Sequence, residues 1–421
     1  MDARTPVITG VGVVAPGGVG SKDFWQLLVD GRTATRPITL FDASAFRSRI
    51  AAEVDFDPAA NGLDRRQVDE LDRMTQFALV SAAEAIADSG IELSECAAET
   101  AVVIGSAVGA TTSLEHEFVN ISGSGARWLV DAAALSAQAY SYLVPSATVA
   151  EVARTLGAGG PCAMISTGCT AGIDAVAHAA ELLREGSAEV AVVGATEAPI
   201  SPISSASFDA ILATTADDSD PAGASRPFDR RRSGFVLAEG AAMFVLETAE
   251  RARRRGADIY CAVAGEGRQA NAFHMTGLRP DGLELSGAIR VALDRARLDP
   301  TAIDYVSAHG SGTQQNDRHE TMALKRALGP HAYRVPVSSI KSMVGHSLGA
   351  IGSIEIAACA LALRHQVVPP TANLYEPDPF CDLDYVPRTA RDASLRTVLT
   401  VGSGFGGFQS AMVLAEVGAV R

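Results

Sequence analysis

Residues 162–185 read CAMISTGCTAGIDAVAHAAELLRE, a strand-like run that passes through a sharp turn into a helix-like run. The composition of Cys162–Thr167 favours a strand, and Gly168 can adopt the positive φ that a tight turn requires. Gly172 has no side chain that would hold the following helix away from the sheet. We therefore predict a strand–turn–helix unit with Cys169 at the turn, the arrangement in which many α/β enzymes present a nucleophile.

The position of Cys169 beside a helix N-terminus has chemical consequences. The positive end of the helix dipole favours the thiolate, which is the nucleophilic form of cysteine. Backbone N–H groups at the same turn can stabilise an oxyanion. When only the turn is considered, Cys169 is explained equally well as an inert buried cysteine. The other cysteines lack this context and are predicted to be structural: Cys96, Cys162, Cys261, Cys359 and Cys381.

The alternation of strand-like and helix-like runs extends along the whole chain. Continuous apolar strands that alternate with helices predict an α/β fold, in which a buried, mostly parallel sheet is covered by helices on both faces. The strand-like runs are 7–14, 100–107, 190–194, 241–246, 259–265, 303–308, 335–339 and 398–402. The helical runs are 75–89, 173–185, 286–297, 318–328 and 353–365.

Two short segments hint at an internal duplication. Residues 168–172 (GCTAG) and 345–349 (GHSLG) share a G-x-x-x-G spacing, and each opens an apolar helix after a short strand. The join would lie near residues 250–258. We therefore predict two related halves, residues 1–255 with the candidate nucleophile and residues 256–421 with candidate histidines.

Composition narrows the function classes. The 421 residues are 47% hydrophobic and 20% charged, which suffices for a large core. A formal net charge of −14 argues against binding to nucleic acid or to an anionic membrane surface. We expect no membrane-spanning segment, and the N-terminus lacks the basic start of a signal peptide. The six scattered cysteines contain no CxxC pair, so we expect a protein of the reducing cytoplasm.

Two histidines and one lysine follow predicted strands. His309 enters a Gly-rich loop (YVSAHGSGT, 305–313), and His346 ends the run VSSIKSMVGH, in which Lys341 stands five residues earlier. Neither histidine has the His or carboxylate spacing of a metal site, so no metal is predicted. These residues alone do not distinguish a catalytic group from two structural histidines and a surface lysine. The Gly-rich segment 401–408 (VGSGFGGF) lies between two strand-like runs and predicts a hairpin with exposed backbone N–H groups.

Taken together and in this order, these segments resemble the β-ketoacyl synthase family of condensing enzymes along essentially the whole chain. The resemblance is carried by STGCTAG (166–172), SRPFDRRRSGFVLAEGA (225–241), AHGSGTQQND (308–317), SSIKSMVGHSLGA (338–350) and GFGGFQSAMVL (404–414). Within the family the chain is most similar to the ketosynthase-alpha subunit of type II aromatic polyketide synthases. That likeness shows in STGCT, NAFHMTGLRPDG (271–282) and NDRHETMALKRALG (316–329).

Two positions bear on the subgroup. Gly168 stands where fatty-acid ketosynthases more often carry Ala, and Ala171 stands where Ser is frequent in the polyketide subgroup. The first favours the polyketide subgroup. The second is a minor departure that affects no candidate catalytic residue.

The resemblance implies the thiolase-like fold, with two duplicated halves in a five-layer α-β-α-β-α sandwich. It also implies an acyltransferase that performs a decarboxylative Claisen condensation. Cys169 would carry the acyl chain, while His309 and His346 would bind the carbonyl of a malonyl thioester and support its decarboxylation. Lys341 would order the histidine pair.

Further residues take roles from the same resemblance. Asp317 and Glu320 would support Lys341. Phe405 would be the gating aromatic, and its backbone N–H and that of Cys169 would form the oxyanion hole. Ser311 and Thr313 would bind the phosphopantetheine arm. No bound cofactor is implied, because the substrates arrive on that arm.

The implied partners are a homologous chain-length factor, in a heterodimer, and an acyl carrier protein. Carrier proteins are acidic, so the arginine clusters at 65–66 and 230–232 are candidate docking sites. Three alternatives remain: a fatty-acid 3-oxoacyl-carrier synthase, a non-catalytic chain-length factor and a cysteine hydrolase. The intact Cys169 argues against the chain-length factor, and a hydrolase would want a residue that orients one histidine as base.

Overall fold

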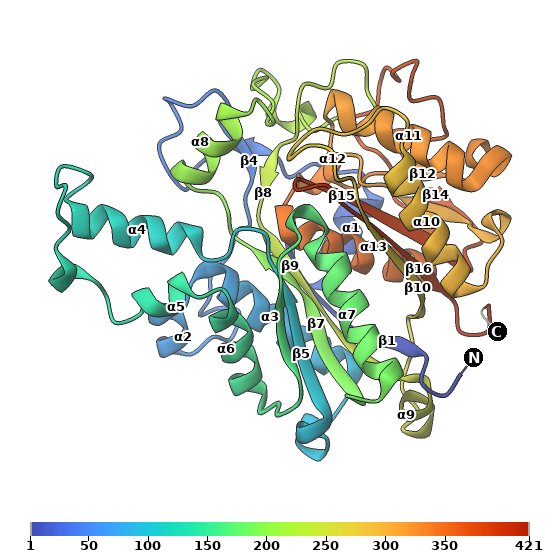
Figure 1. Cartoon of the computed structure of the whole chain (residues 1–421), viewed down its shortest axis with the longest axis horizontal. Helices are drawn as coiled ribbons and strands as arrows, with labels where there is room; N and C mark the ends of the chain where they lie inside the picture. The colour runs from blue at the N-terminus through green and yellow to red at the C-terminus, as the bar shows by residue number, and fades with distance from the viewer. Residues whose placement is uncertain (1, 420–421) are drawn as a thin grey trace.

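A large mixed sheet runs through the molecule, for which a computed structural model describes residues 2–419 (Figure 1). Its N-terminal half holds β1 (Pro6–Ala15), β5 (Thr100–Gly105), β6 (Cys162–Ile165), β7 (Val190–Glu197) and β9 (Gly240–Thr248). Its C-terminal half holds β10 (Cys261–Ala270), β11 (Tyr305–Ser307), β12 (Val337–Ser338), β15 (Thr397–Gly404) and β16 (Phe408–Ala415). The spatial order is β12-β11-β15-β16-β10-β1-β9-β7-β5-β6, with β2 (Gly18–Val19) beside β1.

The two halves of the sheet have the same topology. When the five strands of each half are counted in chain order, both halves run 3-2-4-5-1 in space. The senses also match: the pairs 3-2 and 2-4 are parallel, and the pairs 4-5 and 5-1 are antiparallel. The halves meet where Val7 pairs with Ala262 and Ile8 with Cys261. This repeat confirms the predicted internal duplication.

The prediction of a mostly parallel sheet is wrong. Strands β9 and β16 each run antiparallel to both of their neighbours. They nevertheless consist of continuous apolar runs, because helices or loops cover both faces of the sheet and every side chain of β9 is buried. Strands that are buried on both faces have continuous apolar sequences whether their neighbours are parallel or antiparallel, and this is why the sequence pattern indicated a parallel sheet.

Helices form three layers around the two half-sheets. On the outer face of the N-terminal half lies α3 (Arg73–Ser89), and on that of the C-terminal half lie α10 (Leu283–Ala296) and α11 (Gln314–Leu328). Between the half-sheets lie α7 (Ala171–Glu185) and α13 (Ile351–His365), which contact strands of both (Figure 1). The five-layer α-β-α-β-α sandwich is thus confirmed.

Shorter elements connect these layers. The further helices are α1 (Ser21–Val29), α2 (Arg65–Glu70), α4 (Thr111–Ser122), α5 (Ala139–Leu143), α6 (Ser146–Leu156), α8 (Pro202–Ala210), α9 (Ala249–Arg254) and α12 (Lys341–Val344). The short strands are β3 (Arg36–Pro37), β4 (Ile50–Ala52), β8 (Leu237–Ala238), β13 (Val367–Val368) and β14 (Arg391–Asp392). The boundary at residues 255–256 stays a prediction, and its support is the link between β9 and β10.

The two central helices touch where neither has a side chain. A Cβ on Gly172 would lie 2.4 Å from the backbone nitrogen of Ser353, and a Cβ on Gly352 would lie 2.8 Å from that of Ile173. Gly172 and Gly352 are therefore the equivalent glycines of the duplication. The match predicted between 168–172 and 345–349 is three residues out of register, so Cys169 is equivalent to Gly349 and not to His346.

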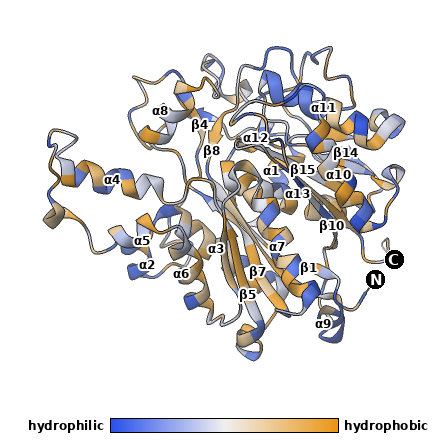
Figure 2. Cartoon of the chain, viewed as in Figure 1, coloured by the Kyte–Doolittle hydropathy of each residue, from blue (hydrophilic) through white to orange (hydrophobic). Residues whose placement is uncertain are grey.

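The central layer is strongly apolar. The stretch Leu348–His365 is long and apolar enough to cross a membrane by length and composition alone, but 89% of it is buried between the half-sheets. The neighbouring strands β5 and β7 are predominantly hydrophobic as well (Figure 2). This stretch is the core helix of the fold, which accounts for its composition.

Candidate active site

Cys169 lies at the turn that the sequence predicts. It belongs to a single 3-10 turn, Gly168–Thr170, which follows β6 and leads into α7. Gly168 has a φ of 61°, where a side chain would be strained. The thiol is partly exposed at the wall of a cavity of about 330 Å³.

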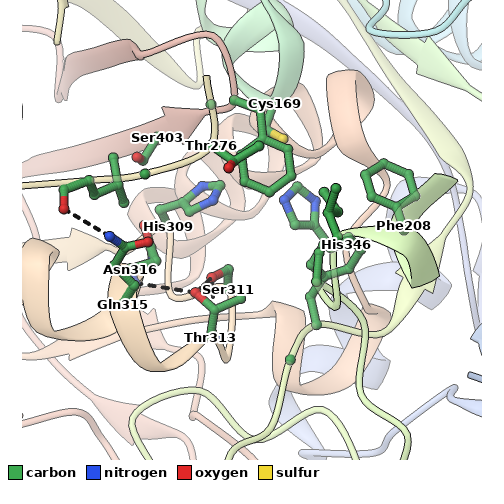
Figure 3. A pocket seen from close by; sticks show the side chains of 18 of the residues that line it. Cys169, Phe208, Thr276, His309, Ser311, Thr313, Gln315, Asn316, His346 and Ser403 are labelled. Carbon is green, nitrogen blue, oxygen red and sulfur yellow. Dashed lines mark hydrogen bonds between the residues drawn. The ribbon is translucent and has the colours of Figure 1, made fainter. Parts of the chain in front are cut away.

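The cavity brings three predicted residues together. Cys169, His309 and His346 all line it, although they come from three separate segments (Figure 3). The two imidazole rings lie 5.3 Å apart between centroids at an interplanar angle of 79°, and Cys169 lines the same cavity. One molecule bound to the thiol would therefore face both imidazoles.

The remaining predicted residues divide into two groups. Ser311, Thr313 and Phe405 also line the cavity, and the two hydroxyl oxygens lie 3.0 Å apart. The second group lies behind the cavity wall and is fully buried: Lys341, Asp317 and Glu320.

The hydrogen bond of His346 fixes its tautomer. Its Nδ1 accepts the backbone N–H of Leu348 at 3.1 Å, so a neutral ring carries its proton on Nε2. Burial lowers the pKa of both His309 and His346 well below the usual value, and the nearby charge of Lys341 lowers each pKa further. His346 is thus a neutral hydrogen-bond donor.

Lys341 acts on the His309 loop from behind. Its Nζ donates to the His309 carbonyl oxygen at 2.5 Å and forms an ion pair with Glu355. Burial raises the pKa of Glu355 to about 7, against the charge of Lys341. Sequence reasoning missed Glu355; the available signal was a lone carboxylate in the otherwise apolar helix α13.

Asp317 and Glu320 contact the loop backbone and not Lys341. Glu320 accepts the N–H groups of His309 and Gly310 at 2.6 and 2.8 Å. Asp317 accepts those of Phe228 and Gly312 at 2.8 and 3.2 Å. The predicted support for the lysine is therefore support for the loop that carries His309.

The predicted arginine clusters are largely committed to ion pairs. Arg232 is fully buried and pairs with Asp317 at 3.1 Å and with Asp378 at 2.8 Å, so it is unavailable for docking. Arg230 pairs with Glu376 at 2.5 Å. The others pair as follows: Arg231 with Asp229, Arg66 with Glu151 and Arg65 with Asp69.

Another buried carboxylate, Glu197, ties the two halves together beside the cavity. It accepts the N–H groups of Ala107 at 2.6 Å and Gly349 at 3.0 Å, and the hydroxyl of Ser106 at 2.7 Å. Burial raises its pKa to about 7. Glu197 thereby fixes the turn that follows His346. Sequence reasoning missed it, because a glutamate at the end of an apolar strand has no local signature.

The thiol of Cys169 departs from the predicted thiolate character. Burial raises its pKa to about 11, and this effect exceeds the opposing influence of Lys341 and of the backbone N–H groups of Phe405 and Cys169. The resting residue is a neutral thiol at pH 7. The same two N–H groups both face the sulfur, as an oxyanion hole requires.

We expect this raised pKa to show in alkylation of the protein by iodoacetamide. The rate at Cys169 should rise about tenfold per pH unit from pH 7 to 9, because only the thiolate reacts and its fraction grows by that factor below the pKa. A Cys162→Ala background removes the other exposed thiol. A plateau below pH 8 would show that the thiolate already dominates at neutral pH.

Within residues 2–419, no three His, Cys, Asp or Glu side chains gather as metal ligands. The six cysteines are all unbonded. The cavity therefore offers a thiol, two imidazoles, two hydroxyls and backbone N–H groups. These groups suit acyl transfer and stabilisation of an enolate.

Comparison with protein families identifies two matches. The model described as "Beta-ketoacyl synthase, N-terminal domain" matches residues 4–252, and that described as "Beta-ketoacyl synthase, C-terminal domain" matches residues 260–375. Together they span most of the chain.

Curated relatives at about 60% identity are named as polyketide β-ketoacyl synthases. The granaticin polyketide putative β-ketoacyl synthase 1 of Streptomyces violaceoruber is 63% identical over 98% of both chains. The oxytetracycline counterpart of Streptomyces rimosus is 60% identical over 100% of this chain and 99% of its own. A 3-oxoacyl-[acyl-carrier-protein] synthase 2 of Coxiella burnetii is 39% identical over 99% of this chain and 100% of its own.

Two solved structures share the whole fold. A type II polyketide-synthase acyl carrier protein in complex with its ketosynthase bound to the hexaketide gives a TM-score of 0.93 at 36% identity, covering 99% of this chain and 100% of that one. The ishigamide ketosynthase/chain length factor gives 0.91 at 32% identity with the same coverage.

Proposed function

The chain belongs to the β-ketoacyl synthase family of condensing enzymes, and we propose that it is the catalytic ketosynthase of a type II polyketide synthase. It would condense malonyl-acyl carrier protein with an acyl chain held on Cys169. The observation that carries this proposal is the single cavity in which the Cys169 thiol faces two backbone N–H groups and two imidazoles of lowered pKa. The fatty-acid alternative is not favoured, since the polyketide relatives are far more similar.

The first half-reaction loads the enzyme. The Cys169 thiol loses its proton, and the sulfur attacks the thioester carbonyl of an acyl carrier protein. The negative charge on that oxygen is stabilised by the N–H groups of Cys169 and Phe405. The carrier thiolate leaves and takes up the proton that Cys169 released, and the acyl group stays on Cys169.

The second half-reaction forms the carbon–carbon bond. The thioester carbonyl oxygen of malonyl-carrier accepts hydrogen bonds from His309 and from Nε2–H of His346. The bond to the carboxylate breaks, carbon dioxide leaves, and its electron pair forms the enolate that these donors stabilise. The enolate carbon attacks the Cys169 thioester, and the cysteine sulfur leaves as a thiolate. This thiolate takes up a proton from solvent and returns to the resting thiol. The product is a β-ketoacyl chain on the carrier.

Neutral histidines fit this role better than charged ones. A cation at the same position would bind the malonyl carboxylate and hold it in place. Burial and the charge of Lys341 keep both rings unprotonated. Lys341 itself sits behind the loop, where its Nζ holds the His309 carbonyl and not the substrate.

Ser311 and Thr313 would bind the phosphopantetheine arm. Both line the cavity on the loop after β11, and the Thr313 hydroxyl also accepts the backbone N–H of Asn316 at the start of α11. We propose no bound cofactor, because the arm of the carrier protein delivers each acyl group. The free cysteines agree with a cytoplasmic location.

The carrier protein would dock on an apolar rim. Ile211, Leu212 and Met275 line the cavity and are 48%, 69% and 71% exposed. A carrier whose arm reaches Cys169 must stand at this mouth. The apolar rim borders the cavity itself, whereas none of the arginines of the two predicted clusters lines it.

An apolar projection supplies a second interface. The arm formed by residues 111–145, with α4 and α5, extends away from the body (Figure 1). Its most exposed apolar side chains are Trp128 (97%), Leu129 (84%), Tyr140 (74%) and Leu143 (64%). Beside this half, β6 is the terminal strand of the sheet and is half exposed. An unpaired edge and an apolar arm suit a homologous subunit, so we propose a chain-length factor here.

We expect the double variant Trp128→Asp/Leu129→Asp to lose co-purification with a co-expressed chain-length factor. Two charges in a desolvated interface lack partners and oppose burial. Val417→Asp serves as the control and should keep the heterodimer. Val417 is an exposed apolar residue near the C-terminus, which lies away from the arm in Figure 1. Retention of the factor by the double variant, or full-length polyketide from the chain alone as a homodimer, would contradict this interface.

Mass spectrometry of the intact protein tests the function directly. After incubation with acyl carrier thioesters, the mass of the acyl group should appear on Cys169. Addition of malonyl-carrier and the chain-length factor should then yield polyketide. Acceptance of saturated acyl chains, with one condensation per chain and no polyketide, would instead establish the fatty-acid alternative.

A further inference from the structure

The two N–H groups of the oxyanion hole come from different halves of the molecule. The N–H of Cys169 belongs to the turn before α7, and that of Phe405 belongs to the hairpin between β15 and β16. An oxyanion needs both donors at hydrogen-bond distance at once. Some contact must therefore set the spacing between turn and hairpin.

Asp174 makes that contact. It lies in the first turn of α7 and is 3% exposed. Its Oδ2 accepts the hydroxyls of Thr167 at 2.6 Å and Thr170 at 2.9 Å, which flank Cys169 on both sides. Its Oδ1 accepts the hydroxyl of Ser410 on β16 at 2.7 Å. One carboxylate thus holds the nucleophile turn with one oxygen and the hairpin with the other.

Nothing but backbone separates the two elements at this point. A Cβ on Gly404 would lie 3.2 Å from the Cys169 nitrogen, and a Cβ on Gly168 would lie 3.1 Å from the Phe405 oxygen. Ser410 pairs with Gly402 across the hairpin. The side chains of Thr170 and Ile173 pack on the hairpin at Gly402. Packing alone is not directional, and the carboxylate of Asp174 adds the hydrogen bond that joins the turn to β16.

We propose that Asp174 is a positioning residue that sets the distance between the Cys169 and Phe405 N–H groups through its link to Ser410. This inference rests on the proposed function of Cys169 as acyl carrier. It does not require Asp174 to touch the substrate or to change the ionisation of the thiol.

Ser410→Ala is the informative variant, since it cuts the link to the hairpin and leaves Asp174 bound to both threonines. Two rates at Cys169 are compared: acyl transfer from a carrier thioester, which uses the oxyanion hole, and alkylation by iodoacetamide, which does not. We expect acyl transfer to fall about tenfold, less than the 10²–10³ for removal of a donor. Alkylation should fall much less than acyl transfer, because burial and not the Phe405 N–H is the largest influence on the pKa of the thiol.

Three further variants frame the result. Ser410→Thr keeps the hydroxyl and should recover most of the acyl transfer. Asp174→Ala should lose more than Ser410→Ala, although it also frees the two threonine hydroxyls and can weaken folding. Ser81→Ala is the matched control, because this buried serine bonds only to its own helix α3. Its acyl transfer should equal that of the parent.

Equal losses of acyl transfer and alkylation in Ser410→Ala would overturn the proposal, since they would mark a general disturbance of the turn. Unchanged acyl transfer would overturn it as well. The failure of the proposed function is distinguishable: in that case the parent protein itself would take no acyl group from the carrier.

Discussion

Replacement of Cys169 by alanine is expected to abolish condensation. Without the sulfur no covalent acyl intermediate can form, and no other side chain that lines the cavity is a comparable nucleophile. The fold should persist, because the thiol is partly exposed and its loss opens no large void. The measurement is polyketide formed per unit time with chain-length factor and malonyl-carrier present, together with the intact mass after exposure to acyl-carrier.

Cys169→Gln separates the two half-reactions. The glutamine amide imitates the acylated cysteine, and its carbonyl oxygen can occupy the N–H groups of Cys169 and Phe405. Condensation should stop, while release of carbon dioxide from malonyl-carrier continues or increases. Cys96→Ala is the matched control, because it removes a buried thiol away from the cavity. Polyketide formation near the parental rate in either Cys169 variant would overturn the assignment.

Much of the architecture could be predicted, because short stretches of sequence determine the turns and helices that build it. The turn at Gly168 needs a positive φ, and the helix after it needs a small residue at Gly172; both requirements are written in adjacent residues. The sense of β9 and β16 could not be predicted, since burial on both faces erases the alternation that marks many antiparallel strands. The register of the duplication failed for a related reason: small residues recur where helices meet, and only the packing of Gly172 on Gly352 shows which ones correspond.

The candidate site was predictable in part. Cys169 and His309 each follow a strand, whereas His346 follows the short helix α12. Their position in the sequence made them candidates, and the combination of family motifs gave them their predicted roles. Glu197 and Asp174 reach Gly349 and Ser410 across long sequence separations and have no local motif, and Glu355 is marked only as the lone carboxylate of α13. The thiol shows a second limit. The helix end favours a thiolate, but burial of the turn, which depends on the whole fold, raises the pKa to about 11 and outweighs it.

Removal of either imidazole from the cavity is expected to lower the rate of decarboxylation more than the rate of acyl transfer. His309→Ala and His346→Ala should each slow release of carbon dioxide from malonyl-carrier by roughly 10²–10³-fold, the usual effect of removing one donor from a preorganised oxyanion site. Acyl transfer to Cys169 should fall much less, because the N–H groups of Cys169 and Phe405 remain. The two rates are read separately, as carbon dioxide release and as mass gained per protein. His178→Ala is the matched control, because this half-exposed histidine on α7 does not line the cavity, and it should change neither rate.

The ionisation of the same histidines gives the pH dependence and its sign. Burial holds the pKa of both rings well below 6.5, so both are neutral in the folded protein throughout the neutral range. Decarboxylation should therefore show no inflection between about pH 6.5 and 8. The unfolded chain binds protons at these histidines more readily than the folded protein does. The contribution of the two neutral rings to the free energy of unfolding is therefore complete above the pKa of a histidine in the unfolded chain, and it is lost as the pH falls below that value. If acylation collapsed in the alanine variants while decarboxylation persisted, or if decarboxylation required a protonated ring with a pKa near 7, the roles proposed for the pair would be wrong.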